Sequence, residues 1–360
     1  MSHRKVRRPS FGQPARVYAA IAAIVVVAGM AVYLARPGPR HDAATETSPH
    51  SSTPTPSPSA SATSPATTSS QGPAARLIPT SGAYLGAYVQ PSVYTPYGEI
   101  AAVRSFQQAV GGPVDLVHTY HAWSSPFPDA ADRYVVRSGK VLLLTWSGTP
   151  DTRKIIAGAY DSVIAARAKA VKRLGRPILL EFRHEMDRPN LQWAVHGPKD
   201  YIAAWDHIRA IFARVGATNV GWVWCPTGWG FRNGRAQAYY PGNSEVDWVC
   251  ADVYAGSTRQ PLQVAAQPFL RWARTTNKPI LIGEYGTYGA PAALPSWLLA
   301  AGEMARLDRQ IKGMAYFDAN GTDSQNRPFQ DYLGGNSAAL RAFHTLLTWG
   351  IFHPVLPPAG

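Results

Sequence analysis

Eight short apolar runs, rich in β-branched and aromatic residues, recur along residues 77–360 and alternate with longer stretches of helical periodicity. We predict that they are the strands Tyr84–Val89, Val114–Tyr120, Val141–Trp146, Pro177–Arg183, Val220–Cys225, Val246–Tyr254, Pro279–Glu284 and Gly313–Phe317. Eight strands alternating with helices are what a (β/α)8 barrel, the TIM barrel, requires. An open doubly wound sheet is the alternative, but no glycine-rich phosphate loop follows the first run. We therefore predict an α/β fold, a (β/α)8 barrel over residues 77–360.

The clearest helix is predicted from Asp151 to Gly175. Asp151 or Thr152 can cap its start, and Gly175 can adopt the left-handed conformation that ends a helix. Its buried face is expected to contain Ile156, Ala159, Val163, Ala166, Ala170 and Leu174, which follow at steps of three or four. Further helices are predicted at Tyr201–Val215, Leu262–Thr275, Pro295–Gln310 and Ala338–Leu347.

The first 35 residues have the pattern of a membrane segment. Residues 1–16 are basic and contain no acid, and residues 17–35 contain no charge. Nineteen apolar residues at about 1.5 Å each span roughly 28 Å, close to the hydrocarbon thickness of a bilayer. We expect residues 17–35 to be an uncleaved transmembrane anchor and residues 1–16 a cytoplasmic tail, because the basic residues are more numerous before the span.

A cleaved signal peptide is the alternative to an anchor, since Gly29-Met30-Ala31 offers a small-x-small cleavage site. Either interpretation exports the rest of the chain. The predicted location is the cell membrane with the barrel outside, or a secreted form if the segment is cleaved.

Residues 36–76 are predicted to be a disordered linker between membrane and barrel. Between residues 41 and 70, 21 of 30 positions are Ser, Thr or Pro. Such a composition buries too little apolar surface to offset the entropy of ordering the chain.

The net charge of +13 does not indicate nucleic-acid binding. Residues 1–40 hold seven Lys/Arg and no acid, residues 41–75 hold two acids, and residues 76–360 hold 28 Lys/Arg against 20 Asp/Glu, so the parts sum as +7, −2 and +8. About half of the excess therefore belongs to membrane topology, and the barrel contains no basic run. We expect no nucleic-acid partner, and a monomer.

Polar and aromatic residues gather where the predicted strands end, which is where barrels of this type carry their functional groups. Glu185 ends the fourth strand and Glu284 the seventh, so the two carboxyl groups are expected to face each other across the mouth. A carboxyl pair of this kind is typical of glycoside cleavage, in which one group donates a proton and the other attacks the anomeric carbon. Glu181 and Arg183 alternate with Glu185 and are expected to pair below it inside the barrel.

Two other chemistries are disfavoured. A zinc-protease helix would require a second histidine at position 188, which is Arg188. His118 and His121 lack a clear third ligand, so we expect no metal and no cofactor. A serine hydrolase would require a Gly-x-Ser-x-Gly elbow, which the chain does not contain.

The chain resembles glycoside hydrolase family 26, the β-mannanase family of retaining (β/α)8 glycosidases. The segments that carry the resemblance are "IIAGAYD" at 155–161, "HEM" at 184–186, "WVWCP" at 222–226, "YYPG" at 239–242, "VDWV" at 246–249, "DVY" at 252–254 and "GEYG" at 283–286. Their order and spacing cover nearly the whole barrel.

The resemblance implies an endo-β-glycanase that acts on a polysaccharide, β-1,4-mannan first, with Glu185 as acid/base and Glu284 as nucleophile. It implies that Tyr254 orients the nucleophile and that His184 bonds toward the nucleophile or the sugar 2-hydroxyl. The other side chains expected to contact substrate are Trp193, His121, Trp224 and Trp229.

The chain departs from the family pattern at several positions. Asp187 and Arg188 follow the acid/base where Asn and Gly are usual, Glu181 stands where many members have Arg, and the eighth strand ends without its usual tryptophan. Other members of the family act on mixed-linkage β-glucan and β-1,3-xylan. These substrates, an exopolysaccharide, or a non-catalytic glycan-binding surface protein are therefore the alternatives.

Cys225 and Cys250 lie on strands expected to be neighbours. The barrel is expected outside the cell, where oxidation is permitted. A disulfide and two buried free thiols are both compatible with the sequence.

Overall fold

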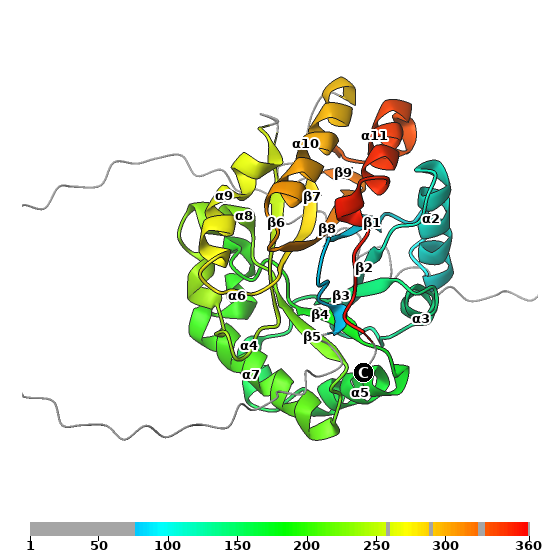
Figure 1. Ribbon diagram of the computed structural model, residues 1–360. Coiled ribbons are helices and arrows are strands. Elements are labelled where there is room, and N and C mark those ends of the chain that lie inside the picture. Colours follow the sequence, from blue (N-terminus) through cyan, green and yellow to red (C-terminus); the bar gives the residue numbers. More distant parts are fainter. Residues whose placement is uncertain (1–75, 257–259, 288–290, 323–327, 359–360) are drawn as a thin grey trace, which may run out of the picture.

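The computed structural model describes residues 76–256, 260–287, 291–322 and 328–358. Eight parallel strands close into a barrel in chain order, with helices around it (Figure 1). The strands are β1 (Tyr84–Val89), β2 (Leu116–Ala122), β3 (Val141–Ser147), β4 (Ile178–Phe182), β5 (Val220–Trp224), β6 (Trp248–Tyr254), β7 (Ile280–Gly286) and β8 (Ile311–Asp318). The predicted (β/α)8 barrel is confirmed, and every strand boundary lies within two residues of its predicted position.

Helices follow the strands and cover the outside of the barrel. They are α2 (Pro96–Ala109), α3 (Ala130–Arg137), α4 (Thr152–Ile156), α5 (Asp161–Leu174), α6 (Gln192–Val195), α7 (Pro198–Val215), α8 (Gly228–Arg232), α9 (Leu262–Ala273), α10 (Leu294–Leu307) and α11 (Ser337–Leu347). A small antiparallel pair, β9 (Asn320–Thr322) and β10 (Pro328–Gln330), follows β8.

The predicted helix from Asp151 to Gly175 is wrong as a single helix. The chain leaves helical geometry after Ile156, passes through Gly158 at φ +80°, and starts a new helix at Asp161. A glycine adopts this left-handed conformation without the steric penalty of a Cβ. Because the break resets the helical phase, the buried face differs from the predicted one: it contains Ile155, Ile164, Ala168 and Val171, while Ile156 is 39% exposed.

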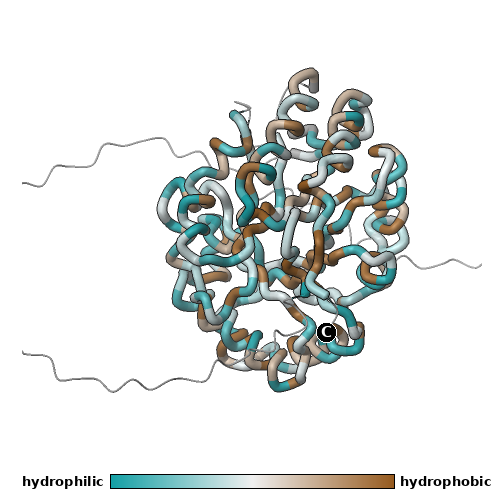
Figure 2. The backbone as a smooth tube through the Cα atoms, in the orientation of Figure 1, coloured by the Kyte–Doolittle hydropathy of each residue, from teal (hydrophilic) through white to brown (hydrophobic). Residues whose placement is uncertain are grey.

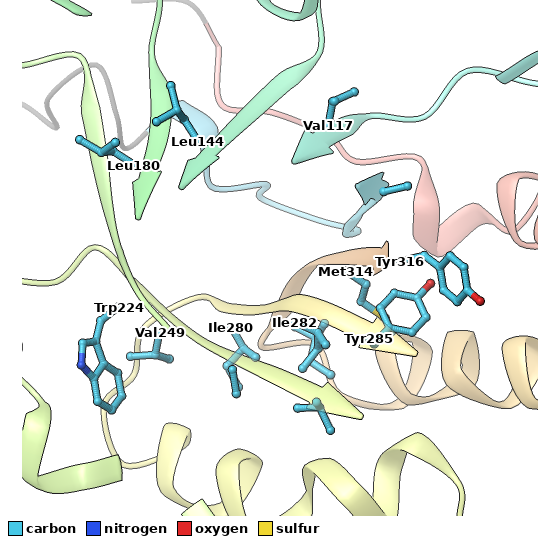
Figure 3. Close-up of a cluster of buried hydrophobic side chains, with 14 of the residues drawn as sticks. Val117, Leu144, Leu180, Trp224, Val249, Ile280, Ile282, Tyr285, Met314 and Tyr316 are labelled. Carbon is cyan, nitrogen blue, oxygen red and sulfur yellow. The ribbon is translucent and has the colours of Figure 1, made fainter. Parts of the chain in front are cut away.

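Two hydrophobic layers hold the barrel together, one between strands and helices and one inside the ring. Side chains of a strand alternate between them, so Leu144, Leu180 and Trp224 face the helices while Leu143, Leu179 and Val223 face the barrel axis. Figure 3 shows members of the outer layer projecting from the strands. In Figure 2 the central strands carry long brown segments, while brown and teal alternate along the surrounding helices.

The predicted tail at 1–16, the predicted anchor at 17–35 and all but the last residue of the linker at 36–76 lie outside the described residues. Within the described part of the chain, no helix combines the length and apolar character needed to cross a bilayer.

Candidate active site

Strand β4 ends in an irregular turn that carries Glu185. Arg183 and Glu185 both have positive φ, +50° and +54°, a conformation that residues other than glycine adopt at an energetic cost of roughly 1–3 kcal/mol. Two backbone hydrogen bonds hold the turn: the amide of Arg183 donates to the carbonyl of Trp146 on β3, and that of Glu185 to the carbonyl of Cys225 after β5. Glu185 is thus fixed by both neighbouring strands.

The carboxyl group of Glu185 contacts the guanidinium of Arg188, with Oε2 2.7 Å from Nη2. The side chain of Glu185 is 7% exposed and that of Arg188 15%. Burial raises the pKa of Glu185 to about 8; Arg188 opposes this shift, and the charge of Glu284 adds to it. Near neutral pH the group therefore keeps its proton, as a general acid requires.

Asp187, one of the residues that depart from the family pattern, connects this turn to the segment after β5. Its Oδ1 accepts from the amide of Thr227 at 2.9 Å and its Oδ2 from the hydroxyl of Thr227 at 2.6 Å. A Cβ at Gly230 would lie 1.7 Å from Oδ2 of Asp187, so only glycine fits there. Asp187 is buried, and its hydrogen bonds hold the turn after β4 against the segment after β5.

Glu284 reaches the mouth through an irregularity in β7. The pairing of β6 with β7 skips Gly283, so that Ala251 pairs with Ile282 and Asp252 with Glu284. A bulge redirects the side chains that follow it, which is why such irregularities are frequent next to active sites. A Cβ at Gly283 would lie 2.6 Å from Sγ of Cys250, so the bulge requires glycine there.

Two tyrosine hydroxyls hold the carboxylate of Glu284. Tyr254 donates to Oε2 at 2.6 Å and Tyr120 donates to Oε1 at 2.5 Å. Both oxygens therefore have a neutral donor, and the carboxylate orientation is fixed. Tyr254 was expected in this position; Tyr120 was not, although it shares strand parity with His118 at the end of β2.

A hydrogen-bonded network continues below Glu284 inside the barrel. His118 contacts the hydroxyl of Tyr120 at 3.2 Å, the carbonyl of Gly283 at 3.1 Å and the hydroxyl of Thr145 at 2.6 Å. Thr145 also donates to Glu181. Burial lowers the pKa of His118 to about 4 and raises that of Glu181 to about 7, so both tend toward the neutral form.

The predicted pairing of Glu181 with Arg183 is wrong. Arg183 donates through Nη1 to the carbonyls of Gly148 and Pro150 in the loop after β3, while Glu181 bonds Thr145. The positive φ of Arg183 breaks the strand alternation on which the prediction depended.

His184 immediately precedes Glu185, and its ring lies beside Tyr120, which binds Glu284. Its ring meets that of Tyr120 edge to face with centroids 5.6 Å apart, and its Nδ1 has no hydrogen-bond partner among the described residues. Burial lowers its pKa to about 4, so the imidazole is neutral and its free nitrogen can serve a substrate hydroxyl.

A cavity of about 190 Å³ opens between the loops after β1 and β2 and reaches Tyr120. Tyr88 and Phe317 stack in its wall with ring centroids 4.8 Å apart. Phe317 is the last aromatic residue of β8. His121 also lines the cavity, where its Nε2 lies 2.8 Å from Oδ2 of Asp132. Burial lowers the pKa of His121, but Asp132 outweighs burial and raises it to about 9.

The three predicted tryptophans have different surroundings. Trp193 on α6 is 65% exposed. Trp229 is half-buried under the guanidinium of Arg235, 4.5 Å from the ring centroid. Trp224 is fully buried in the outer layer, 5.0 Å from the ring of Tyr240 and away from the mouth. The prediction of substrate contact is therefore wrong for Trp224, because strand parity turns it toward the helices.

Cys225 and Cys250 form a disulfide inside the barrel, with sulfur atoms 2.10 Å apart. Glu181 comes close to both sulfurs, but bonded cysteines do not offer thiolate ligands. In a second cluster, Asp129 and Asp132 cap helix α3 and His121 pairs with Asp132. Neither cluster, within the described part of the chain, offers a free set of metal ligands.

Comparison with known proteins agrees with this site. Residues 141–268 match the model of glycosyl hydrolase family 26. Endoglucanase H of Acetivibrio thermocellus is 32% identical over 245 residues, which are 61% of this chain and 26% of that protein. Over residues 141–268 the barrel belongs to glycoside hydrolase family 26. The resemblance inferred from the sequence is thereby confirmed.

Other relatives of the family 26 domain are more distant. Beta-1,3-xylanase TXYA of a Vibrio species is 28% identical over 151 residues, 40% of this chain and 30% of that protein. The chain thus spans about a quarter to a third of the length of the curated relatives it matches. Among solved structures, a family 26 β-mannanase from Bacteroides ovatus superposes with a TM-score of 0.57 at 15% identity, covering 76% of this chain and 90% of that one.

A further solved structure is similar in fold. The catalytic domain of an endo-β-1,4-mannanase from Bacillus sp. JAMB-750 also has a TM-score of 0.57, at 17% identity, and covers 78% of this chain and 89% of that one. At this level of identity the two mannanases establish a shared fold.

Proposed function

We propose that the family 26 domain is a retaining endo-β-glycanase that cleaves an extracellular polysaccharide. The observation that supports the proposal is that two carboxyl groups in the same barrel mouth have different environments. Glu284 is oriented by Tyr120 and Tyr254, while the pKa of Glu185 is raised to about 8. One group is prepared to attack and the other to donate a proton.

In the first step, one oxygen of Glu284 attacks the anomeric carbon and Glu185 gives its proton to the departing glycosidic oxygen. A glycosyl ester on Glu284 and a shortened glycan result. Because esterification removes the charge of Glu284, one of the causes that raise the pKa of Glu185 disappears. Glu185 is then a carboxylate that takes a proton from water, and the hydroxide formed releases the sugar with retained configuration.

The tyrosines and His184 would assist this sequence. As Glu284 becomes an ester, the hydroxyls of Tyr120 and Tyr254 can turn toward the ring oxygen or the 2-hydroxyl of the sugar. The Nδ1 of His184, which has no hydrogen-bond partner among the described residues, offers a further bond to a hydroxyl. The aromatic wall of Tyr88 and Phe317 and the exposed ring of Trp193 provide flat surfaces for sugar rings.

The backbone of the substrate is proposed to be a β-linked glucan before β-1,4-mannan, the substrate implied by the sequence resemblance. Endoglucanase H, a relative at 32% identity, is named an endoglucanase, whereas the mannanases support only the fold. β-1,3-xylan is the third candidate, from the two xylanase relatives.

Release of reducing sugar from mixed-linkage β-glucan, β-1,4-mannan and β-1,3-xylan tests the proposal. We expect release from at least one polymer by the native protein and none by Glu284→Ala. Binding to a polymer without release, unchanged in Glu185→Gln, would instead favour a non-catalytic glycan-binding protein. The membrane anchor at residues 17–35 and the monomeric state remain predictions, which fractionation of producing cells and light scattering test.

A further inference from the structure

The contact between Arg188 and Glu185 fits only one stage of the proposed reaction. The two side chains form an ion pair at 2.7 Å when Glu185 is ionised. Attack on a glycoside begins with Glu185 protonated, and a neutral carboxylic acid attracts a guanidinium much less than a carboxylate does. At the start of the first step, the Arg188 guanidinium is therefore charged while its ion-pair partner, Glu185, is neutral.

Among the described residues, Asp187 and Asp252 also feel the charge of Arg188, but only at longer range than an ion pair. Glu185 is the only carboxylate within 4.0 Å of the Arg188 guanidinium in the described part of the chain. The side chain of Arg188 is only 15% exposed, so water replaces the lost partner incompletely. A guanidinium cannot lose its charge near neutral pH. A group from the bound substrate is the remaining candidate for a partner.

The position of Arg188 tells which sugar would carry this group. Glu185 gives its proton to the oxygen of the leaving group, so it lies beside the sugar on the leaving side of the scissile bond. Arg188 shares the carboxyl group of Glu185 and hence borders the same sugar. Arg235 adds a second positive charge here, because its Nη2 donates to the carbonyl of Asp187 at 2.5 Å.

We propose that Arg188 binds a carboxylate carried by the leaving-group sugar, so that the enzyme prefers an acidic β-glycan. The carboxylate belongs to a uronic acid or to an acidic substituent on a neutral sugar; the chemistry that Arg188 recognises is the same. This inference rests on the proposed glycanase function and specifies its substrate class.

The exchange of partners is coupled to the two half-reactions. In the first, the substrate carboxylate holds Arg188 while Glu185 passes its proton to the leaving oxygen. The departing sugar removes that carboxylate at the moment when Glu185 has become an anion. Arg188 then pairs with Glu185 while the glycosyl ester is hydrolysed, and the positive charge has a partner at each stage.

The test compares two derivatives of the backbone that the release assay identifies. One is carboxymethylated and the other hydroxyethylated, to the same low degree of substitution, so that they differ mainly in charge. We expect the native protein to show a kcat/KM about tenfold higher on the carboxymethylated polymer, as a charge-assisted hydrogen bond provides. Mass spectrometry should find carboxymethyl groups enriched on the new non-reducing ends, which derive from leaving-group sugars.

Three variants make the test specific. Arg188→Gln should bring the ratio of the two kcat/KM values to about one, whereas Arg188→Lys, which keeps a point charge, should retain part of the preference. Arg341→Gln removes an exposed charge from α11 and should leave the ratio as in the native protein.

A ratio at or below one in the native protein, or a ratio unchanged by Arg188→Gln, would overturn the assignment of Arg188 while leaving the glycanase function in place. Release from no backbone in the earlier panel would overturn the proposed function itself, and this inference with it.

Discussion

Glu284 lies on the bulged strand β7 and accepts hydrogen bonds from two neutral hydroxyl groups. Glu185, by contrast, has a left-handed backbone conformation and contacts a guanidinium group. Tyr120 and Tyr254 fix the direction of the Glu284 carboxylate without adding charge. Arg188 acts on the proton affinity of Glu185. The tyrosines thus set the orientation of the nucleophile, and Arg188 sets the pKa of the acid. We therefore expect that either property can be changed by mutation without changing the other.

The largest difference between the two glutamates should appear when each is removed. We expect Glu284→Ala to lower kcat on the order of 10⁵-fold with every substrate, because no covalent intermediate can form. Glu185→Ala should lower kcat by about 10²–10⁴-fold on polysaccharide, and far less on a dinitrophenyl glycoside, whose leaving group needs no proton. Steady-state rates on both substrates measure this, and equal losses on the dinitrophenyl glycoside would contradict the separate roles.

Removing the tyrosine hydroxyls should disturb the orientation of the Glu284 carboxylate without affecting Glu185. Tyr254→Phe and Tyr120→Phe are each expected to lower kcat/KM by about 10–100-fold, since each hydrogen bond goes to an ionised group. Tyr285→Phe is the matched control, because that residue adjoins Glu284 but its buried hydroxyl has no hydrogen-bond partner among the described residues. A loss in the control equal to the other two would show that the hydroxyls act only through packing.

Removing the charge of Arg188 should change the pKa of the acid, Glu185, and leave the nucleophile, Glu284, unaffected. Arg188 lowers the pKa of Glu185 against the effect of burial, so Arg188→Gln raises that pKa and Glu185 keeps its proton to higher pH. The alkaline limb of kcat/KM on the hydroxyethylated polymer should move upward by about one pH unit. A pH profile measures it, with Arg341→Gln as the control; a downward shift is incompatible with this account.

The smallest effect on catalysis is expected from removing the disulfide, which lies inside the barrel below Glu185 and Glu284. Cys225→Ala combined with Cys250→Ala opens a loop with a sequence separation of 25 residues, and the free energy of unfolding should fall by about 3 kcal/mol. Denaturant titration measures it. We expect kcat to change by less than about threefold, because hydrogen bonds fix Glu185 and Glu284 independently of the bridge. A larger loss of activity in the folded variant would show that the disulfide positions the mouth.

The fold was predictable because its strands are short continuous apolar runs separated by helical patterns, and these runs placed each strand boundary within two residues. The helix at 151–175 was not, because its apolar spacing continues through a break at Gly158. Trp224 was assigned to the mouth from its place at a strand end; its parity, shared with Trp222, turns it outward. Strand parity thus carries more information than proximity to a strand end.

The two glutamates could be found from the sequence, but not their partners. Regular alternation from Ile282 would turn Glu284 outward and Tyr285 inward. The bulge at Gly283 reverses both, so that Glu284 enters the mouth and Tyr285 faces the helices. The contact of Arg188 with Glu185 depends on a left-handed turn that no residue type at 183–185 indicates. Both features arise from packing between neighbouring strands, which a linear pattern does not contain.

The stereochemistry of the first product tests the central claim most directly. Proton NMR during the first turnovers on the polymer that the release assay identifies resolves the anomeric configuration of the new reducing end. A covalent ester on Glu284 followed by hydrolysis with Glu185 predicts β-configured product that later mutarotates. An α-configured first product would mean direct displacement by water, and would contradict the assignment of Glu284 as nucleophile.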